Sequence, residues 1–184
     1  MIIKSHEVQK KISSLLKYNL FLVYGENFGL KKDIKELIKK ELKEKKNDIE
    51  ILSLYENEIL HNEENFHNLV YSGSLFSEKK IIAINEATDK ITEKISNIYD
   101  KYPENIFLLI FSEILEKKSK LRNFFETNKK TICIPCYLDS EKDLEIITQS
   151  ELKKNNIKLS QEAVNLLKVL FYRVLTFFYL TSMI

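Results

Sequence analysis

The sequence contains little cysteine and no excess of charge of either sign. Two cysteines among 184 residues cannot build a disulfide framework, so reduced thiols are expected. The 29 basic and 27 acidic side chains leave a formal net charge of +2. No overall field therefore attracts the chain to nucleic acid, and any contact with DNA must be local.

Apolar stretches that direct proteins to membranes, or anchor them there, are also missing. Residues Met1 to Glu7 carry charges where a signal peptide needs an apolar segment. The apolar residues near the end of the chain are interrupted by Arg173, whereas about 18 or more uninterrupted ones would be needed to cross a bilayer. A cytoplasmic protein without a membrane anchor is expected.

What the chain does contain is an alternation of short apolar runs and amphipathic segments. With 44% hydrophobic and 30% charged residues, it has the balance of a soluble globular protein. Strands that alternate with helices imply a parallel sheet covered on both faces, which is the α/β class. The predicted strands are residues 20–24, 49–54, 80–85, 106–111 and 131–134, and the predicted helices are residues 5–18, 30–46, 64–70, 90–102 and 117–127.

The pattern changes after Tyr137, where apolar residues are spaced for helices with no strand between them. We expect a first domain over residues 1–138 and a small helical domain over residues 139–184. Within the second domain, Ser160 is predicted to be the N-cap of a helix.

The turn after the first strand lies where a P-loop NTPase holds its phosphates. A working loop has four residues between its glycines and a Ser or Thr after its lysine, so that backbone N–H groups, an ammonium and a metal-bound hydroxyl converge on the phosphates. Here three residues separate Gly25 from Gly29, no hydroxyl follows Lys31, and Glu26 would repel phosphate. A degenerate phosphate loop is predicted, with no nucleotide cofactor.

The aspartate that would hold the metal of an NTPase is missing as well. It should end an apolar strand, but residues 84–86 read Ile-Asn-Glu and residues 110–113 read Ile-Phe-Ser-Glu. We therefore expect an NTPase-like scaffold with no catalytic site of its own and no metal. A P-loop or AAA+-type nucleotide hydrolase is the principal alternative.

The two cysteines, Cys133 and Cys136, have the spacing of a dithiol redox pair. Because Cys133 lies within a predicted strand, buried cysteines at a strand end are the favoured interpretation. A redox protein is a third alternative. The three histidines of the chain are not spaced to complete a zinc site with this pair.

A basic cluster on the predicted helix 117–127 could contact phosphates of DNA, although a solvated helix face is the favoured interpretation. No aromatic or base-reading motif accompanies it. The candidate DNA contacts are Lys117, Lys118, Lys120 and Arg122.

The segment Gly73-Ser74-Leu75-Phe76 places two large apolar side chains in a Gly/Ser-rich turn. Turns are normally polar, and an exposed Leu-Phe pair can anchor a partner protein. The alternative is that both side chains fold back into the core, and the sequence leaves the choice open.

Six segments, taken in their order along the chain, together resemble the delta subunit of bacterial DNA polymerase III. The resemblance covers about residues 1–168 and implies an AAA+-like domain without ATPase function, followed by a helical lid and then a collar domain. This chain ends within the lid, so we expect a partial lid, an atypical, truncated or frame-shifted end, and no collar. The resembling segments are residues 20–26, 73–76, 81–84, 115–121, 134–137 and 157–163.

The resemblance also implies a function. Members of the family are clamp-loader subunits of the DNA polymerase III holoenzyme, a nucleotidyltransferase complex, and in DNA replication they bind the sliding clamp, or beta subunit, and open its ring. By this resemblance, Leu75 and Phe76 match the pair that enters a hydrophobic pocket on the clamp, and Gly73 and Ser74 belong to the same clamp-binding segment. ATP would act through other clamp-loader subunits, which are partners if the collar is not required, and contact with DNA would be indirect or weak.

Overall fold

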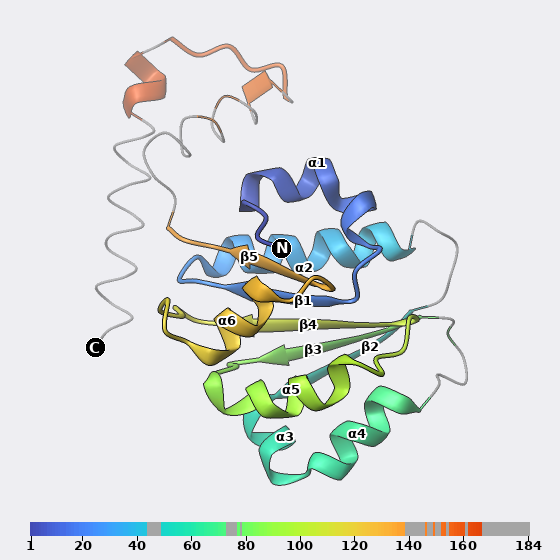
Figure 1. Cartoon of the computed structure of the whole chain (residues 1–184). Coiled ribbons are helices and arrows are strands. Elements are labelled where there is room, and N and C mark those ends of the chain that lie inside the picture. The colour runs from blue at the N-terminus through green and yellow to red at the C-terminus, as the bar shows by residue number, and fades with distance from the viewer. Residues whose placement is uncertain are drawn as a thin grey trace. The chain divides into compact units, whose positions relative to one another are not determined.

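The computed structural model describes residues 1–43, 49–72, 77, 79–138, 146, 149, 152–153, 155–160 and 162–166 (Figure 1). The chain divides into two compact units, Met1–Tyr137 and Leu138–Ile184.

The first unit is built on a five-stranded sheet in the order β2-β3-β4-β1-β5, and every neighbouring pair of strands is parallel. The prediction of an α/β fold with a parallel sheet is therefore confirmed. All five predicted strands are present, each within one residue of its predicted bounds. The strands are β1 (Leu20–Tyr24), β2 (Ile49–Tyr55), β3 (Lys79–Asn85), β4 (Ile106–Ser112) and β5 (Thr131–Pro135).

The helices follow the prediction with one addition. An extra helix, Glu56–His61, begins directly after β2, where no helix was predicted. The prediction that the basic helix starts at Lys117 was wrong: it starts at Lys120, because the Ser119 hydroxyl accepts a hydrogen bond from the Arg122 N–H and caps it. The helices are α1 (Ser5–Leu15), α2 (Phe28–Lys43), α3 (Glu56–His61), α4 (Glu63–Tyr71), the 3₁₀ turn η1 (Asp89–Ile91), α5 (Thr92–Tyr99) and α6 (Lys120–Thr127).

The helices cover both faces of the sheet, as Figure 1 shows, with α1 and α2 on one face and α3 to α6 on the other. Successive side chains of a strand point to opposite faces, so a strand can contribute side chains to two hydrophobic cores, one on each face of the sheet. In β4, Leu109 packs toward α1 and α2, whereas Leu108 and Ile110 pack toward the other helices. All seven residues of β4 are buried, as expected for a central parallel strand.

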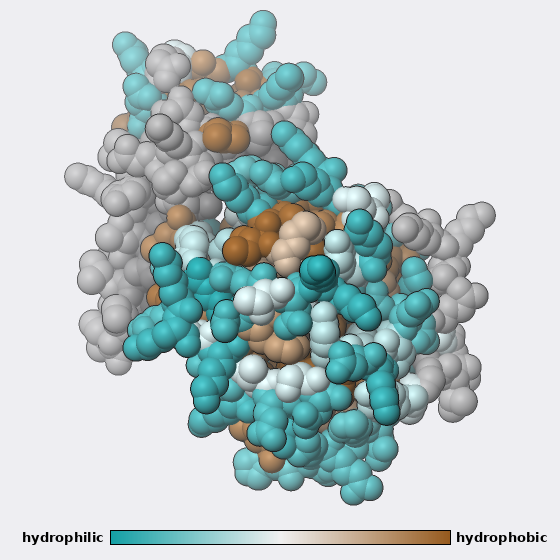
Figure 2. Space-filling view, viewed as in Figure 1, coloured by the Kyte–Doolittle hydropathy of each residue, from teal (hydrophilic) through white to brown (hydrophobic). Residues whose placement is uncertain are grey.

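The outer surface of this unit is mainly hydrophilic in the view of Figure 2, with apolar side chains scattered between polar ones.

At the β5 edge, the chain start adds a short parallel bridge. The Ile3 N–H donates to the Cys133 carbonyl at 2.9 Å, and the Cys133 N–H donates to the Met1 carbonyl at 2.9 Å. These bonds satisfy backbone groups that an open sheet edge would leave unpaired.

In the second unit, residues 162–166 are helical. The Ser160 hydroxyl accepts a hydrogen bond from the Ala163 N–H at 3.2 Å, so the predicted N-cap is confirmed. Among the residues that the structure describes, no helix is long and apolar enough to cross a membrane. The apolar end of the chain, residues 167–184, lies outside the described residues.

Candidate functional site

The degenerate phosphate loop lies at the carboxyl edge of the sheet, directly after β1. This strand lies between β4 and β5, although both of these come later in the chain. In open α/β sheets, ligands bind outside the carboxyl ends of the strands, where the strand order reverses in this way. The loop therefore occupies the position where a nucleotide would bind, and its contacts determine whether it can.

Gly25 allows an unusually close approach between this loop and the segment after β5. Its φ is +130°, a conformation that L side chains rarely adopt. A Cβ built on Gly25 would lie 2.1 Å from the carbonyl oxygen of Cys136, well inside van der Waals contact. Only glycine fits here, because the side chain of any other residue would clash with the backbone of Cys136.

Three backbone N–H groups in and beside the loop donate hydrogen bonds within the protein. Gly25 N–H donates to the Glu113 carbonyl at 3.1 Å, and Asn27 N–H donates to the Cys136 carbonyl at 3.0 Å. At the start of α2, the Leu30 N–H donates to the Asn27 side-chain oxygen at 3.0 Å. A phosphate cradle needs such donors to converge on a ligand. Here these three donors already bond to carbonyl and amide oxygens of the protein.

The loop lysine is likewise directed inward. Lys31 Nζ donates to the Ser112 carbonyl at the end of β4, at 3.0 Å. Burial lowers the pKa of Lys31, and this effect outweighs the nearby groups that favour its charged form, Cys136, Glu113 and Glu26. The Lys31 ammonium thus connects α2 to the end of β4, and it would have to break this hydrogen bond to bind a phosphate.

The ends of β3 and β4 also make contacts within the protein. The Asn85 side-chain amide donates to the Ser53 hydroxyl at 2.9 Å and to the Leu54 carbonyl at 3.1 Å. The Ser112 hydroxyl donates to the Ala87 carbonyl at 2.5 Å. In the described part of the chain, no three His, Cys, Asp or Glu side chains lie together so that they could hold a metal ion.

Arg122 is less exposed than the neighbouring lysines. It donates to Glu126 at 2.7 Å and to the Leu115 carbonyl at 3.0 Å, and its guanidinium lies 5.2 Å from the centre of the Tyr24 ring. Its side chain is only 16% exposed, against 86% for Lys118. Lys117, Lys118 and Lys120 are exposed, and the contact of these lysines and of Arg122 with DNA stays a prediction.

The cysteines do not have the environment of a redox pair. Cys133 and Cys136 are both buried, and neither forms a disulfide. Burial raises the pKa of the Cys133 thiol to about 12, so its thiolate, the reactive form, is scarce at neutral pH. The alternative of a dithiol redox protein has no support in this geometry.

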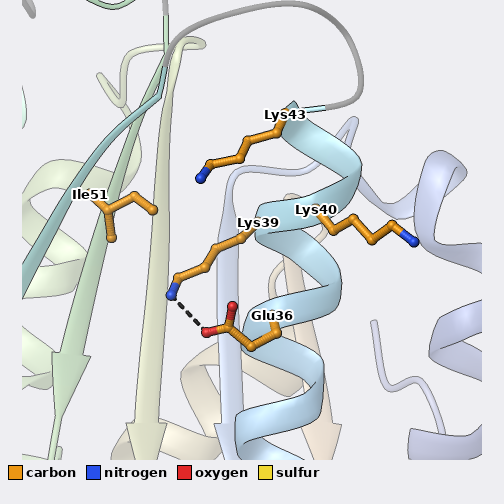
Figure 3. A pocket seen from close by; sticks show the side chains of 5 residues that line it. All are labelled: Glu36, Lys39, Lys40, Lys43 and Ile51. Atoms are coloured by element: carbon orange, nitrogen blue, oxygen red, sulfur yellow. Dashed lines mark hydrogen bonds and ion pairs between the residues drawn. The ribbon is translucent and has the colours of Figure 1, made fainter.

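A surface pocket of about 520 Å³ lies between α2 and β2, away from the degenerate loop. Figure 3 shows Lys39 and Lys43 on the side of Ile51, with Lys39 paired to Glu36 at 2.7 Å. The pocket brings together none of the predicted site residues. Its three lysines all belong to α2, and Lys40 and Lys43 are exposed.

The predicted anchor, Gly73, Ser74, Leu75 and Phe76, lies outside the described residues. The described residues on either side are Ser72, which follows α4, and Ser77, which precedes β3. The anchor therefore belongs to the connection between α4 and β3.

Comparison with known proteins agrees with this fold. The model of the family "DNA polymerase III, delta subunit" matches residues 21–137. A probable DNA polymerase III subunit delta of Rickettsia prowazekii is 27% identical over 154 residues, which are 83% of this chain and 45% of that protein. This chain thus spans about half the length of its relative.

Two solved structures share the fold. The DNA clamp loader delta protein of Bacillus subtilis aligns with a TM-score of 0.58 and 12% identity, over 87% of this chain and 50% of that chain. AMPPCP-bound DnaA from Aquifex aeolicus aligns with a TM-score of 0.52 and 15% identity, over 88% and 54%. The matched residues 21–137 make up more than half of the 184-residue sequence. The chain therefore belongs to the DNA polymerase III delta subunit family.

Proposed function

We propose that this chain is a cytoplasmic delta-type clamp-loader subunit that binds the sliding clamp and favours the open form of its ring, without hydrolysing a nucleotide itself. One observation carries the proposal: three N–H donors at the predicted degenerate phosphate loop are bonded within the protein, to Glu113, Cys136 and Asn27. In a chain of the delta family, this leaves binding to a partner as the function that the fold supports best.

The proposed contact with the clamp is the pair Leu75 and Phe76, in the segment that also contains Gly73 and Ser74. Each side chain can gain about 1.5–3 kcal/mol when it is buried in an apolar pocket. Interfaces concentrate their binding energy in a few such side chains. Two neighbouring anchors are enough to dominate the affinity.

Ring opening would follow from a difference in affinity. A ligand shifts an equilibrium only as far as it binds one state better than the other. A subunit that binds the open clamp better than the closed one therefore favours opening. ATP would act through other clamp-loader subunits, with which this chain would assemble.

The remaining parts have supporting roles in this proposal. Residues 1–138 would form the clamp-binding domain, and residues 139–184 would supply helices of the lid. The exposed Lys117, Lys118 and Lys120, together with Arg122, could add weak phosphate contacts with DNA. Because the net charge of the chain is only +2, this contact is expected to be minor.

The proposal is tested by surface plasmon resonance with immobilised clamp. The wild-type chain is expected to bind, and the double variant Leu75→Ala/Phe76→Ala is expected to lose at least about a hundredfold in affinity, which corresponds to two truncated anchors. Circular dichroism should show the same helix and strand content for both proteins.

A matched control comes from an exposed apolar residue elsewhere. Ile114 is 60% exposed at the carboxyl edge of the sheet, and Ile114→Ala should bind the clamp like the wild-type chain. Equal affinity of the double variant and the wild-type chain would contradict the assignment of the anchor. A folded wild-type chain that does not bind the clamp would contradict the proposed function.

A further inference from the structure

One lysine of the sheet is buried, and a buried ammonium needs an explanation. Lys80 is the second residue of β3, and its side chain is 4% exposed. Removing an ammonium from water costs several kcal/mol unless hydrogen bonds and opposite charge offset it. The partners of Lys80 therefore indicate what the residue does.

Three of these partners are atoms at the end of α4. Lys80 Nζ donates to the Leu69 carbonyl at 3.2 Å, to the Ser72 carbonyl at 2.9 Å and to the Ser72 hydroxyl at 3.4 Å. The fourth partner is the Glu50 carboxylate on β2, at 3.7 Å. The last carbonyls of a helix have no partner within the helix, and a cation is favourable there. From β3, Lys80 therefore supplies hydrogen-bond donors to carbonyl groups at the C-terminus of α4.

This contact joins the two ends of one connection. Ser72 is the last described residue before residues 73–76, and Lys80 lies just inside the strand that follows. The Lys80 ammonium thus links Ser72, the residue that follows α4, to the start of β3. The opposite end of α4 is held separately, since Lys94 of α5 pairs with Glu63.

We propose that Lys80 is a positioning residue for clamp binding. By holding Ser72 against β3, it fixes both ends of the connection that carries Leu75 and Phe76. Ordering a segment before it binds lowers the entropy lost on binding and so raises affinity. This inference rests on the proposed function, and it adds a residue that would act through the anchor without touching the clamp.

A purely structural role for Lys80 makes a different prediction. If the ammonium only stabilised the fold, its loss would lower the free energy of unfolding, but the folded molecules would bind the clamp with unchanged affinity. The dissociation constant of the active fraction therefore separates the two roles.

The test compares Lys80→Met with Lys94→Met by surface plasmon resonance on immobilised clamp, with the active concentration measured for each protein. Both variants remove an ammonium that contacts α4, but only Lys80 lies at the end next to the anchor. Lys80→Met is expected to weaken clamp affinity by about tenfold, mainly through faster dissociation, and Lys94→Met by less than about twofold.

A double-mutant cycle with Leu75→Ala shows whether Lys80 acts through the anchor. If it does, the loss caused by Lys80→Met shrinks from about tenfold to about threefold or less in the Leu75→Ala background. Hydrogen exchange of a peptide spanning residues 70–79 should also become faster in Lys80→Met and stay unchanged in Lys94→Met.

The two proposals fail in different ways. Absence of binding by the wild-type chain would overturn the proposed function, and this inference with it. If the wild-type chain binds, equal affinity of Lys80→Met, or losses that simply multiply in the cycle, would overturn the role of Lys80 alone. Should Lys80→Met not fold, Lys80→Gln, which keeps an N–H donor without the charge, is judged by the same two criteria.

Discussion

Gly25→Ala is expected to lower the free energy of unfolding by about 3–5 kcal/mol, from backbone strain and overpacking together. The added Cβ would meet the Cys136 carbonyl at 2.1 Å, and the φ of +130° is unfavourable for alanine. Relief of the clash would require the loop to move away from the segment after β5, which would disturb the Asn27–Cys136 hydrogen bond. Urea unfolding followed by circular dichroism measures the change.

The other glycine of the loop provides the control. Gly29 lies in the first turn of α2, and the nearest atom to a Cβ there is 3.6 Å away, an ordinary contact. Gly29→Ala should be neutral or stabilise the chain by up to about 1 kcal/mol, because alanine favours helix. Equal stability of the two alanine variants would contradict the close approach of Cys136 to Gly25.

Phe66→Ala is expected to lower the free energy of unfolding by about 3–5 kcal/mol, the usual cost of removing a buried aromatic ring. Phe66 belongs to α4, is 1% exposed, and lies in the core between the sheet and α3 to α6. Its ring holds the helix that leads to the proposed anchor. Thermal or urea unfolding measures the effect.

The same substitution at the surface is the matched control. Phe28 begins α2 and is 75% exposed, so Phe28→Ala should change stability by less than about 0.5 kcal/mol. The two variants differ in burial and not in chemistry. A small effect at Phe66 would mean that α4 is not docked on the sheet as described.

The sheet could be predicted because its strands are nearly continuous apolar runs. β3 and β4 lie inside the sheet and are buried along most of their length, which leaves a clear signal in the sequence. Helix α3 was missed because its six residues follow β2 without a turn. One local signal was present: the Glu58 carboxylate accepts a hydrogen bond from the Tyr55 N–H, as in a capping box.

The chemistry of the site could be predicted only in part. Spacing and residue type predicted a degenerate loop, but not the acceptors of its N–H groups, since Glu113 and Cys136 are distant in sequence and reach Gly25 and Asn27 only through the strand order. Helical spacing likewise placed Arg122 with the surface lysines, whereas its contacts with Leu115 and Tyr24 turn it inward.

Lys80 was predicted only as the first residue of a strand. A lysine beside Ile81 and Ile82, in a strand expected to be buried, was nevertheless a signal that its ammonium needs partners. Those partners, on α4 and β2, depend on how the strands pair and cannot be read from the local sequence.

The most direct test of a clamp-binding subunit with a closed phosphate loop is the affinity of the purified chain for the sliding clamp, measured by surface plasmon resonance with and without Mg²⁺ and ATP. We predict binding with the same dissociation constant in both conditions, because Asn27 N–H and Lys31 Nζ are already bonded within the protein. Binding that appears only with ATP, or changes by more than about tenfold on its addition, would contradict this account.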